Sequence, residues 1–497
     1  MTILIYNSLT KKKEELIPLD GKTIKMYSCG VTVYDKCHIG HARSLYIFDV
    51  IRRYLKYRGY QVYFARNITD VDDKIINRAK ELGRSFDEIV RENIEAYERD
   101  LKNLGVDKAD TEPRATQYIP KIIAFVEGLI KKDFAYEVDG DVYYSVRKFE
   151  GYGKLSGQSI DQMIEATRIE KDSKKRDSLD FALWKKAKGG EKSWSSPWGE
   201  GRPGWHIECS CMSMNELKGD TIDIHAGGRD LIFPHHENEI AQSEALTGQT
   251  FAKHWIHHGL LTINGQKMAK SLGNFITLDE VLKKYSSDAL KLFFLQSHYS
   301  NPVDFSWKKM DEADKKLNAF YTLFNKIAQI KQNMELESNQ GRVRKIDFLE
   351  ERKQLFFNAM DDDFNSAKAL VCLFDIINET NVFVDSYEKT HHKETGIKII
   401  KAGEIIEELA KDALALTLPP FKNATIMPEV LTVSTSTVDS IVLVKKELPD
   451  EERKLLSARD KARNNKDFQQ SDELRNLLRK KGIIVEDTKE GQVWRWA

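Results

Sequence analysis

The chain has 497 residues, which is too long for a single hydrophobic core and predicts three or four domains. Its hydrophobic fraction of 41% is that of an ordinary globular protein, and no apolar run is long enough to span a bilayer, so we expect a cytoplasmic protein without a membrane partner. Lysine plus arginine equals aspartate plus glutamate at 77 each, so any nucleic-acid contact must come from local patches and not from an overall basic excess.

The first part of the chain predicts a strand, a helix and a second strand. Residues 24–34 are β-rich, and residues 41–58 repeat apolar side chains three and four apart, as an amphipathic helix does. Gly59 is a natural helix stop, and residues 61–68 alternate as a strand. A strand, helix and strand at this spacing indicate a βαβ unit and a parallel sheet.

The pattern then loosens into an insertion, and strands return at residues 221–225 and 255–263. Beyond residue 278 the chain is strongly helical, with apolar stripes typical of a bundle core. Residues 423–444 indicate a linker or a small β element. Residues 448–479 predict two charged helices, followed by a strand at 483–485 and an aromatic, basic end at 494–496.

The expected fold class is therefore α/β. It consists of a Rossmann-like parallel-sheet domain with an insertion, followed by an α-helical bundle and a small C-terminal domain. The expected boundaries are 1–116 and 201–300 for the sheet domain, 117–200 for the insertion, 301–422 for the bundle, and 423–497 for the linker and C-terminal domain.

A short motif, residues 37–41 (Cys-His-Ile-Gly-His), falls where the first strand gives way to the helix. The N-terminus of a helix offers free N–H groups and a positive dipole end, which suit phosphate. Gly40 would let a ligand approach the backbone, and His38 and His41 could donate hydrogen bonds to phosphate oxygens. Taken alone, the four residues from His38 to His41 fit a structural capping turn or a metal-binding pair better.

A second motif, residues 267–271 (Lys-Met-Ala-Lys-Ser), is followed by Leu272-Gly273-Asn274. Lys267 and Lys270, three residues apart beside a glycine loop, could reach two phosphates. Taken alone, this segment fits a solvated basic turn better.

Five cysteines in a long chain do not indicate a disulfide framework, so metal binding or simple burial is the better interpretation. Groups that zinc could bind are spread over Cys29, Cys209, Cys211, His235, His236, Glu237 and Glu239. On a helix, Glu239 shares a face with His235 and also with His236, so spacing leaves the histidine open. Each cysteine taken singly fits a buried small hydrophobe.

The motifs occur in a fixed order with four longer segments, 26–35, 66–74, 201–210 and 233–239. Together they resemble the cysteinyl-tRNA synthetase family of class I aminoacyl-tRNA synthetases, and the resemblance covers essentially the whole chain. It implies ATP-dependent ligation of L-cysteine to tRNA(Cys) through a cysteinyl-adenylate, with Mg²⁺ accompanying ATP.

The resemblance also implies residue roles. One zinc ion per chain would be held by Cys29, Cys209, His235 and Glu239, with Cys37, Cys211 and Cys372 outside the site. The amino-acid pocket would comprise Gly30, Thr69, Trp205, His225 and Asp230. His38, His41, Lys267 and Lys270 would be catalytic, and Gly40 and Lys270 would bind ATP. A substrate thiolate would join the zinc ion, so that serine is rejected without an editing domain.

The insertion, with its basic segment 171–176, would meet the acceptor end of the tRNA, and the C-terminal helices with residues 494–496 would meet the anticodon. A monomer is the expected state. Ala269 departs from the family, whose second motif usually carries serine there, and we expect a modest effect at most.

Three alternatives stay open: a ligase that attaches cysteine to a small-molecule amine, a catalytically inactive tRNA-binding relative, and a zinc hydrolase. Residues 430–497 disfavour the first, the intact motifs disfavour the second, and a full set of four protein ligands disfavours the third.

Overall fold

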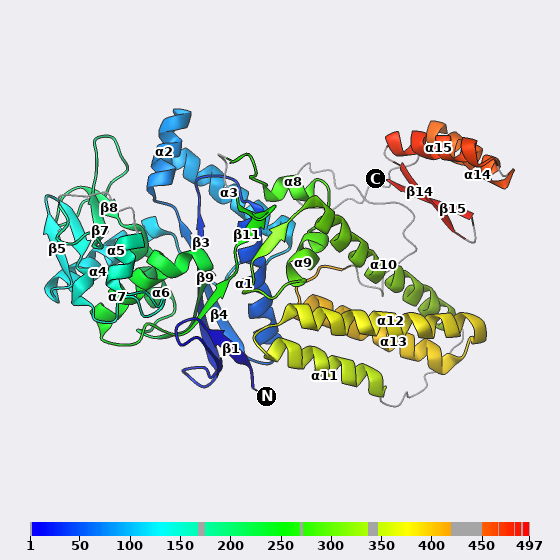
Figure 1. Cartoon of the computed structure of the whole chain (residues 1–497), viewed down its shortest axis with the longest axis horizontal. Helices are drawn as coiled ribbons and strands as arrows, with labels where there is room; N and C mark the ends of the chain where they lie inside the picture. The colour runs from blue at the N-terminus through cyan, green and yellow to red at the C-terminus, as the bar shows by residue number, and fades with distance from the viewer. Residues whose placement is uncertain are drawn as a thin grey trace. The chain divides into compact units, whose positions relative to one another are not determined.

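The computed structural model describes residues 2–166, 174–268, 272–335, 346–418, 450–465, 467–481, 483–488 and 491–496 (Figure 1). The chain divides into two compact units, Met1–Pro420 and Phe421–Ala497, and each is described by itself. Within the described ranges, none of the helices combines the length and apolar composition that a bilayer crossing needs.

The centre of the first unit is a four-stranded, all-parallel sheet in the order β10-β9-β3-β4. Its strands are β3 (Thr23–Thr32), β4 (Gln61–Thr69), β9 (Ile222–Gly228) and β10 (Ala252–His258). The predicted α/β class and the first βαβ unit are thus confirmed, with helix α1 (Ile39–Tyr57) connecting β3 to β4. Because the strands are parallel, their carboxyl ends share one edge, where α/β sheets place ligands.

Helix α1 begins two residues before the predicted start because the side chain of His38 caps it. The helix ends at Tyr57, and Gly59 then takes a positive φ of 89°, which glycine adopts without steric cost. The side of α1 that faces the core is buried, including Leu45, Phe48 and Ile51.

The predicted strand at 255–263 is divided in the structure. β10 ends at His258, and β11 (Leu261–Ile263) belongs to a second sheet with β12 (Gln266–Lys267) and β13 (Val303–Phe305). The break falls at Gly259, where an added Cβ would lie 2.2 Å from the Asn301 backbone. Close packing of these two backbones therefore separates the sheets.

Further elements surround the central sheet. They are the antiparallel hairpin β1 (Leu4–Asn7) and β2 (Lys12–Glu15), and the helices α2 (Asp73–Leu82), α3 (Phe86–Leu104), α6 (Trp205–Glu216), α7 (Glu237–Thr247), α8 (Leu278–Leu282) and α9 (Ser287–Leu295). Short helical turns, η3 (Arg229–Leu231) and η4 (Ile232–His236), precede α7.

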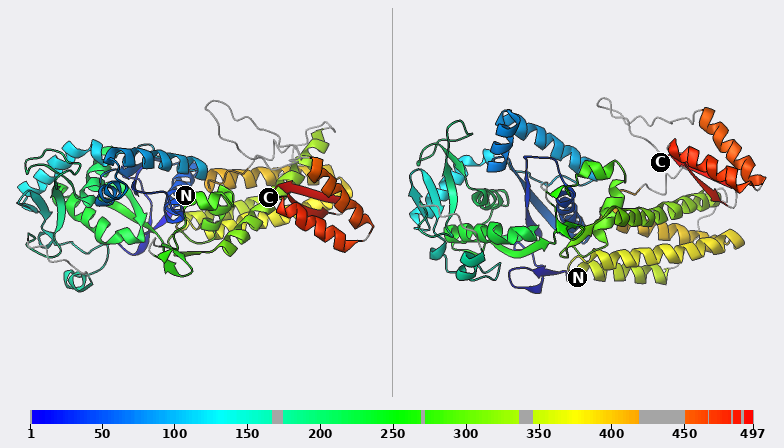
Figure 2. Two further views of the ribbon diagram at one scale, coloured as in Figure 1. Left: turned by 90° about the horizontal axis from the view of Figure 1, so that it is seen from above. Right: turned by 45° about the horizontal axis from the view of Figure 1, so that its top comes forward.

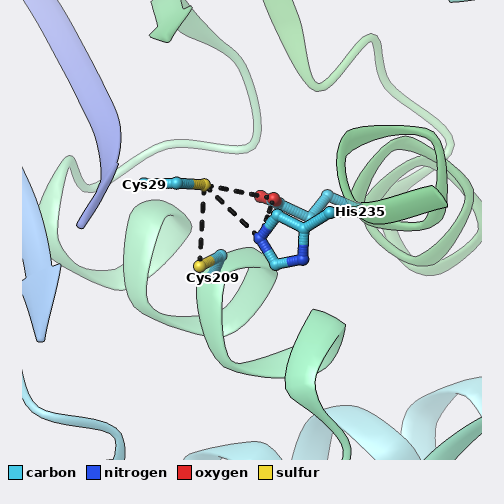
Figure 3. Close-up of side chains that lie close together, drawn as sticks. Cys29, Cys209 and His235 are labelled. Atoms are coloured by element: carbon cyan, nitrogen blue, oxygen red, sulfur yellow. Dashed lines mark hydrogen bonds and ion pairs between the residues drawn. The ribbon is translucent and has the colours of Figure 1, made fainter. Parts of the chain in front are cut away.

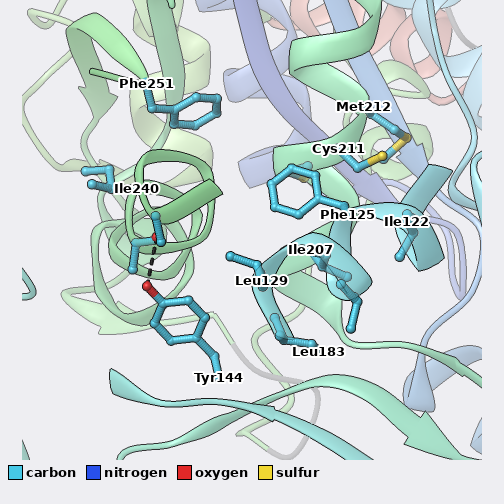
Figure 4. Close-up of a cluster of buried hydrophobic side chains, with 14 of the residues drawn as sticks. Ile122, Phe125, Leu129, Tyr144, Leu183, Ile207, Cys211, Met212, Ile240 and Phe251 are labelled. Carbon is cyan, nitrogen blue, oxygen red and sulfur yellow. Dashed lines mark hydrogen bonds between the residues drawn. The ribbon is translucent and has the colours of Figure 1, made fainter. Parts of the chain in front are cut away.

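The insertion forms its own antiparallel sheet in the order β5-β6-β7-β8. Its elements are η1 (Ala115–Gln117), α4 (Ile119–Lys131), β5 (Ala135–Val138), β6 (Asp141–Tyr144), η2 (Val146–Lys148), α5 (Ile160–Ala166), β7 (Phe181–Lys186) and β8 (Gly201–Pro203). A hydrophobic cluster joins α4 and this sheet to α6 and α7 (Figure 4). Because β8 leads directly into α6, the insertion fixes the start of that helix.

The bundle is built from α10 (Trp307–Glu335), α11 (Asp347–Asp361), α12 (Ser366–Thr390) and α13 (Lys393–Glu408), which run alongside one another (Figures 1 and 2). The last of them, α13, leads into the short helical turn η6 (Leu409–Ala413). The predicted core stripe on α10 is buried: Leu317, Phe320, Leu323, Phe324 and Ile327 are at most 2% exposed.

The second unit contains α14 (Asp450–Asn464), α15 (Phe468–Lys480) and an antiparallel hairpin of β14 (Ile483–Thr488) and β15 (Gly491–Trp496). The two predicted helices and the strand at 483–485 are confirmed, and residues 494–496 belong to β15. The predicted element at 423–444 and residues 171–173 of the basic segment lie outside the described residues.

Candidate functional site

Four buried donor side chains converge near the carboxyl end of β3, and Figure 3 labels three of them. The Sγ atom of Cys29 lies 3.8 Å from Sγ of Cys209, 3.5 Å from Nε2 of His235 and 3.4 Å from Oε1 of Glu239. All four donor atoms lie within 4.8 Å of one another. These are the ligand atoms that the family resemblance assigned to zinc.

Each donor comes from a different element. Cys29 lies in β3 at the point where the register with β4 shifts, Cys209 is on α6, His235 is in η4, and Glu239 is in the first turn of α7. Beside Cys29, a Cβ on residue 30 would lie 1.7 Å from the Asn67 carbonyl oxygen, so only glycine permits this approach.

The donor chemistry fits zinc, because two thiolates, one imidazole and one carboxylate make a four-ligand set of the kind that zinc binds tetrahedrally. A second set, Cys29, His225, His236 and Glu239, also lies within 4.8 Å. The ambiguity between His235 and His236 therefore persists in space: their Nε2 atoms lie 3.5 and 3.3 Å from the Cys29 sulfur.

Ionised groups in the cluster stabilise one another. A hydrogen bond from the Cys29 thiol lowers the pKa of Cys209 to about 6, against the effect of burial. Burial alone would lower the pKa of His235, but the Glu239 carboxylate and the Cys209 sulfur raise it to about 10. Burial likewise opposes ionisation of Glu239, yet His225 and His235 hold its pKa well below the usual value. Cys209 and Glu239 are thus held as anions, whereas burial and Cys209 raise the pKa of Cys29, so a divalent cation would displace protons from Cys29 and His235.

Further rings orient these donors. The ring of His235 stacks on Trp205 with centroids 4.2 Å apart, and its Nδ1 lies 2.9 Å from Nδ1 of His206. His225 is fully buried, stacks on Trp255 at 4.4 Å, and places Nε2 2.8 Å from Oε2 of Glu239. Metal ligands commonly depend on such supporting hydrogen bonds.

A cavity of about 340 Å³ opens beside this cluster, and Cys29 is part of its wall. Of the predicted site residues, seven more line it: Gly30, His38, Gly40, His41, Trp205, Asp230 and Lys267. The structure therefore brings the first motif and the described part of the second motif to one cavity with a candidate zinc ligand. Lys270 and Ala269 lie outside the described residues.

Two predicted pocket residues do not line this cavity. Thr69 is buried at the end of β4, where its Oγ1 accepts from Nδ2 of Asn67 at 3.1 Å. His225 lies behind Glu239, as described above. Each of them contacts a residue that in turn contacts the cavity wall. Asn67, the partner of Thr69, accepts a hydrogen bond from the backbone N–H of Gly30, and Glu239, the partner of His225, contacts Cys29.

His38 fulfils the structural alternative that the sequence left open and also lines the cavity. Its Nδ1 accepts the backbone N–H groups of Gly40 at 3.1 Å and His41 at 3.2 Å. Because Nδ1 is an acceptor, the neutral ring carries its proton on Nε2. Burial lowers the pKa of His38 to about 4, so the ring is neutral at pH 7. A cap of this kind leaves Nε2–H as the donor for a ligand.

Position 40 requires glycine for a second reason, which sequence reasoning missed. A Cβ at this position would lie 2.9 Å from Cε1 of His38, whose ring folds over the backbone. The glycine therefore admits the capping histidine as well as leaving room for a ligand. His38 and His41 stack with centroids 3.6 Å apart.

Sequence reasoning also missed the support that His225 gives to Glu239, and it missed Lys74 in the cavity wall. Lys74 belongs to the segment 66–74 that carries the family resemblance, but a single lysine has no spacing signal. Neither contact could be read from a local pattern, because each joins parts of the chain that only the fold brings together.

The fold and the matched family models define the class of protein. Residues 15–315 match the model described as "tRNA synthetases class I (C) catalytic domain", residues 355–415 match the DALR domain, and residues 445–495 match the cysteinyl-tRNA ligase anticodon binding domain. The structure is similar to that of Mycobacterium tuberculosis methionyl-tRNA synthetase in complex with methionyl-adenylate, with a TM-score of 0.61, 14% identity, and coverage of 79% of this chain and 92% of that one. The fold is that of a class I aminoacyl-tRNA synthetase.

Relatives that match over their full length show which family of class I synthetases the chain belongs to. The chain is 47% identical to the cysteine–tRNA ligase of Persephonella marina over 100% of both chains. It is also 47% identical to that of Geobacillus thermodenitrificans over 99% of both chains. The chain therefore belongs to the cysteine–tRNA ligase family.

Proposed function

We propose that this protein joins L-cysteine to tRNA(Cys) in two steps, through a cysteinyl-adenylate, and that a zinc ion held by Cys29, Cys209, His235 and Glu239 selects the substrate. One observation supports this assignment above the others: Cys29 lines the same cavity as His38 and Lys267. A substrate in this cavity can therefore touch the metal centre and the nucleotide motifs at once.

When bound, zinc would supply a soft Lewis-acid site that a thiolate joins and a neutral hydroxyl does not. The protein's part is to orient the donors: His225 holds the outer oxygen of Glu239, while His206 and Trp205 hold the ring of His235. Selection of cysteine over serine then needs no editing step, since the site rewards a feature that only cysteine has.

Asp230 is the only carboxylate among the described residues that line the cavity, and we assign it to the substrate's α-ammonium group. Gly30 and Trp205 form the wall beside it. Thr69 and His225 act from behind the wall, through Asn67 and Glu239 respectively.

In the first step, the cysteine carboxylate attacks the α-phosphorus of ATP. A bond forms between a carboxylate oxygen and the α-phosphorus. The bond from the α-phosphorus to the oxygen that bridges to the β-phosphate breaks, and pyrophosphate leaves with its electrons. The carboxylate is already ionised, so no protein base is needed, and catalysis consists of positioning and charge stabilisation. We assign this work to His38, His41, Lys267 and Lys270, with Gly40 beside the ATP and Mg²⁺ accompanying it.

In the second step, the terminal adenosine hydroxyl of the tRNA attacks the carbonyl carbon of the cysteinyl-adenylate. An ester bond forms, the bond from that carbon to the AMP phosphate oxygen breaks, AMP leaves with its electrons, and the hydroxyl proton passes to solvent. The insertion would meet the acceptor end, and the second unit, whose family match is an anticodon-binding domain, would meet the anticodon. A monomeric state and a cytoplasmic location are part of the same proposal.

A charging assay tests the function against its nearest alternative, a ligase that attaches cysteine to a small-molecule amine. The full chain is incubated with radiolabelled cysteine, ATP and a tRNA(Cys) transcript, with a tRNA(Ser) transcript as the matched control. We expect acid-precipitable label on tRNA(Cys) alone. Adenylate formation without label on either tRNA would support the amine ligase instead.

A further inference from the structure

Lys74 lies in the wall of the cavity of about 340 Å³ described above, and the function proposed so far gives it no role. It is the second residue of α2, which begins just after β4 at the carboxyl edge of the sheet. The cavity that it lines is also lined by His38, His41 and Lys267. A lysine from the first turn of α2 thus shares the cavity with both nucleotide motifs.

The acidic residues nearest to Lys74 in the sequence all contact groups other than its ammonium group. Asp70 accepts from the backbone N–H and the hydroxyl of Thr116 at 2.9 and 2.6 Å. Asp72 caps α2, accepting the backbone N–H of Lys74 at 2.8 Å. Asp73 pairs with Arg202 and, at 2.8 Å, with Lys185, both from the insertion sheet.

Lys74 consequently keeps an unneutralised ammonium group. No carboxylate oxygen of the described residues lies within 4.0 Å of its Nζ atom. Its Nζ atom lies over the ring of Tyr34, another cavity residue, 5.4 Å from the ring centroid. A cation–π contact orients an ammonium group without cancelling its charge.

Two other basic side chains, Arg66 and Lys267, line the cavity, and each differs from Lys74 in its partner or its assigned role. Arg66 also lines the cavity, but its guanidinium is buried and donates to Glu112 at 2.8 Å. Lys267 belongs to the second motif and already has a proposed role. Among the described cavity residues, Lys74 is therefore the one cation that is neither paired with a carboxylate nor already assigned to a substrate.

We propose that Lys74 is a further catalytic residue for adenylate formation, whose ammonium group binds the β- and γ-phosphate oxygens of ATP and stabilises the departing pyrophosphate. This inference rests on the proposed function. Lys74 shares the cavity wall with His41. Burial, His38 and the charge of Lys74 all lower the pKa of the His41 ring, so the charge of the lysine lies close to the first motif. In the reaction, negative charge moves onto pyrophosphate as the bond from the α-phosphorus breaks, and a fixed cation there lowers the barrier.

The position of Lys74 also ties it to the insertion. Asp73 joins the first turn of α2 to β7 and β8 through Lys185 and Arg202. These ion pairs hold the start of the helix, and with it the backbone of Lys74, against the insertion sheet. The lysine is therefore presented to the cavity from a fixed helix terminus, while its long side chain can follow the phosphates.

The test is cysteine-dependent ATP–pyrophosphate exchange with Lys74→Met and Lys74→Arg. Lys80→Met on the same helix is the matched control, because Lys80 is exposed, pairs with Glu191 and does not line the cavity. We expect Lys74→Met to lower the exchange rate about 10–100-fold and to raise the KM for pyrophosphate, with the KM for cysteine nearly unchanged. Lys74→Arg should restore most of the rate, and Lys80→Met should match the parent chain.

Each of three other outcomes would overturn the inference. Normal exchange by Lys74→Met with impaired charging of tRNA would assign the lysine to an RNA phosphate. A raised KM for cysteine at an unchanged rate would assign it to the substrate carboxylate. Equal loss in Lys74→Met and Lys74→Arg, with the thermal transition lowered in both, would make it structural. The parent chain separates these results from the function itself, since exchange absent there would contradict the proposed function and not the role of Lys74.

Discussion

The imidazole of His225 holds one oxygen of Glu239 and thereby turns the other toward Cys29 and His235 of the donor cluster. Nε2 of His225 lies 2.8 Å from Oε2, while Oε1 lies 3.0 Å from Nε2 of His235 and 3.4 Å from the Cys29 sulfur. Both side chains are fully buried, so water cannot replace this hydrogen bond. His225, which was predicted to line the amino-acid pocket, thus has the position of a support for Glu239, a candidate zinc ligand.

His225→Ala should weaken zinc binding about 10–100-fold, because an unsupported carboxylate pays more to adopt the ligating orientation. Competition with a coloured chelator measures the affinity. His254→Gln is the control: His254 is also buried, on β10, but its ring contacts the Asp223 carbonyl. Equal affinities for His225→Ala and the parent chain would contradict a supporting role.

Two buried cysteines on α6, Cys209 and Cys211, allow the effect of losing a candidate zinc ligand to be distinguished from the effect of changing a buried cysteine. Cys209 points into the donor cluster, whereas Cys211 packs in the hydrophobic cluster between α4 and α6 (Figures 3 and 4). Cys209→Ser should therefore lose bound zinc, and Cys211→Ser should keep about one ion per chain. Metal analysis of the purified variants measures this. Zinc retained by Cys209→Ser but lost from His236→Gln would place the ion in the second donor set.

The cap formed by His38 predicts that its structural and catalytic roles can be separated. His38→Ala should lower the free energy of unfolding by about 1 kcal/mol, since an N-cap acceptor is lost. Asparagine is a good N-cap, so His38→Asn should retain that stability. Both variants lose the Nε2–H donor, and exchange should fall about 10–100-fold in each. Denaturant titration and exchange assays measure the two effects. Normal exchange by His38→Asn would reduce the histidine to a cap.

The pH dependence of exchange should contain no ionisation of the first motif near neutrality. Burial lowers the pKa of His38 to about 4 and that of His41 below its usual value, so both rings stay neutral as the pH rises from about 6 to 8. They protonate only at lower pH. The profile of His38→Asn should therefore parallel that of the parent chain at a lower rate. A limb near pH 6.5 that disappears in the variant would show that the histidine titrates there.

The sequence predicted those parts of the fold that depend on local patterns. The β3–α1–β4 unit follows from alternation, helical periodicity and Gly59, and the buried stripe on α10 follows from its spacing. The break between β10 and β11 could not be predicted, because it depends on the approach of the Asn301 backbone to Gly259. A contact between residues 42 positions apart leaves no local signal.

The site residues, like the elements of the fold, could be predicted only where a local pattern marks them. The motif histidines were found because they sit together at a strand–helix junction, where parallel sheets bind ligands. Spacing could not choose between His235 and His236, and the structure places both near the Cys29 sulfur, so the resemblance still decides that assignment. Lys74 and the contact between His225 and Glu239 needed the fold, since each depends on neighbours distant in sequence.

The most direct test of the account is amino-acid-dependent ATP–pyrophosphate exchange, with cysteine and serine compared in zinc-loaded and zinc-stripped protein. We expect exchange with cysteine alone, lost when zinc is removed and regained when zinc is returned. Exchange supported equally by serine, or unaffected by removal of zinc, would contradict the claim that Cys29, Cys209, His235 and Glu239 select the substrate through a bound metal.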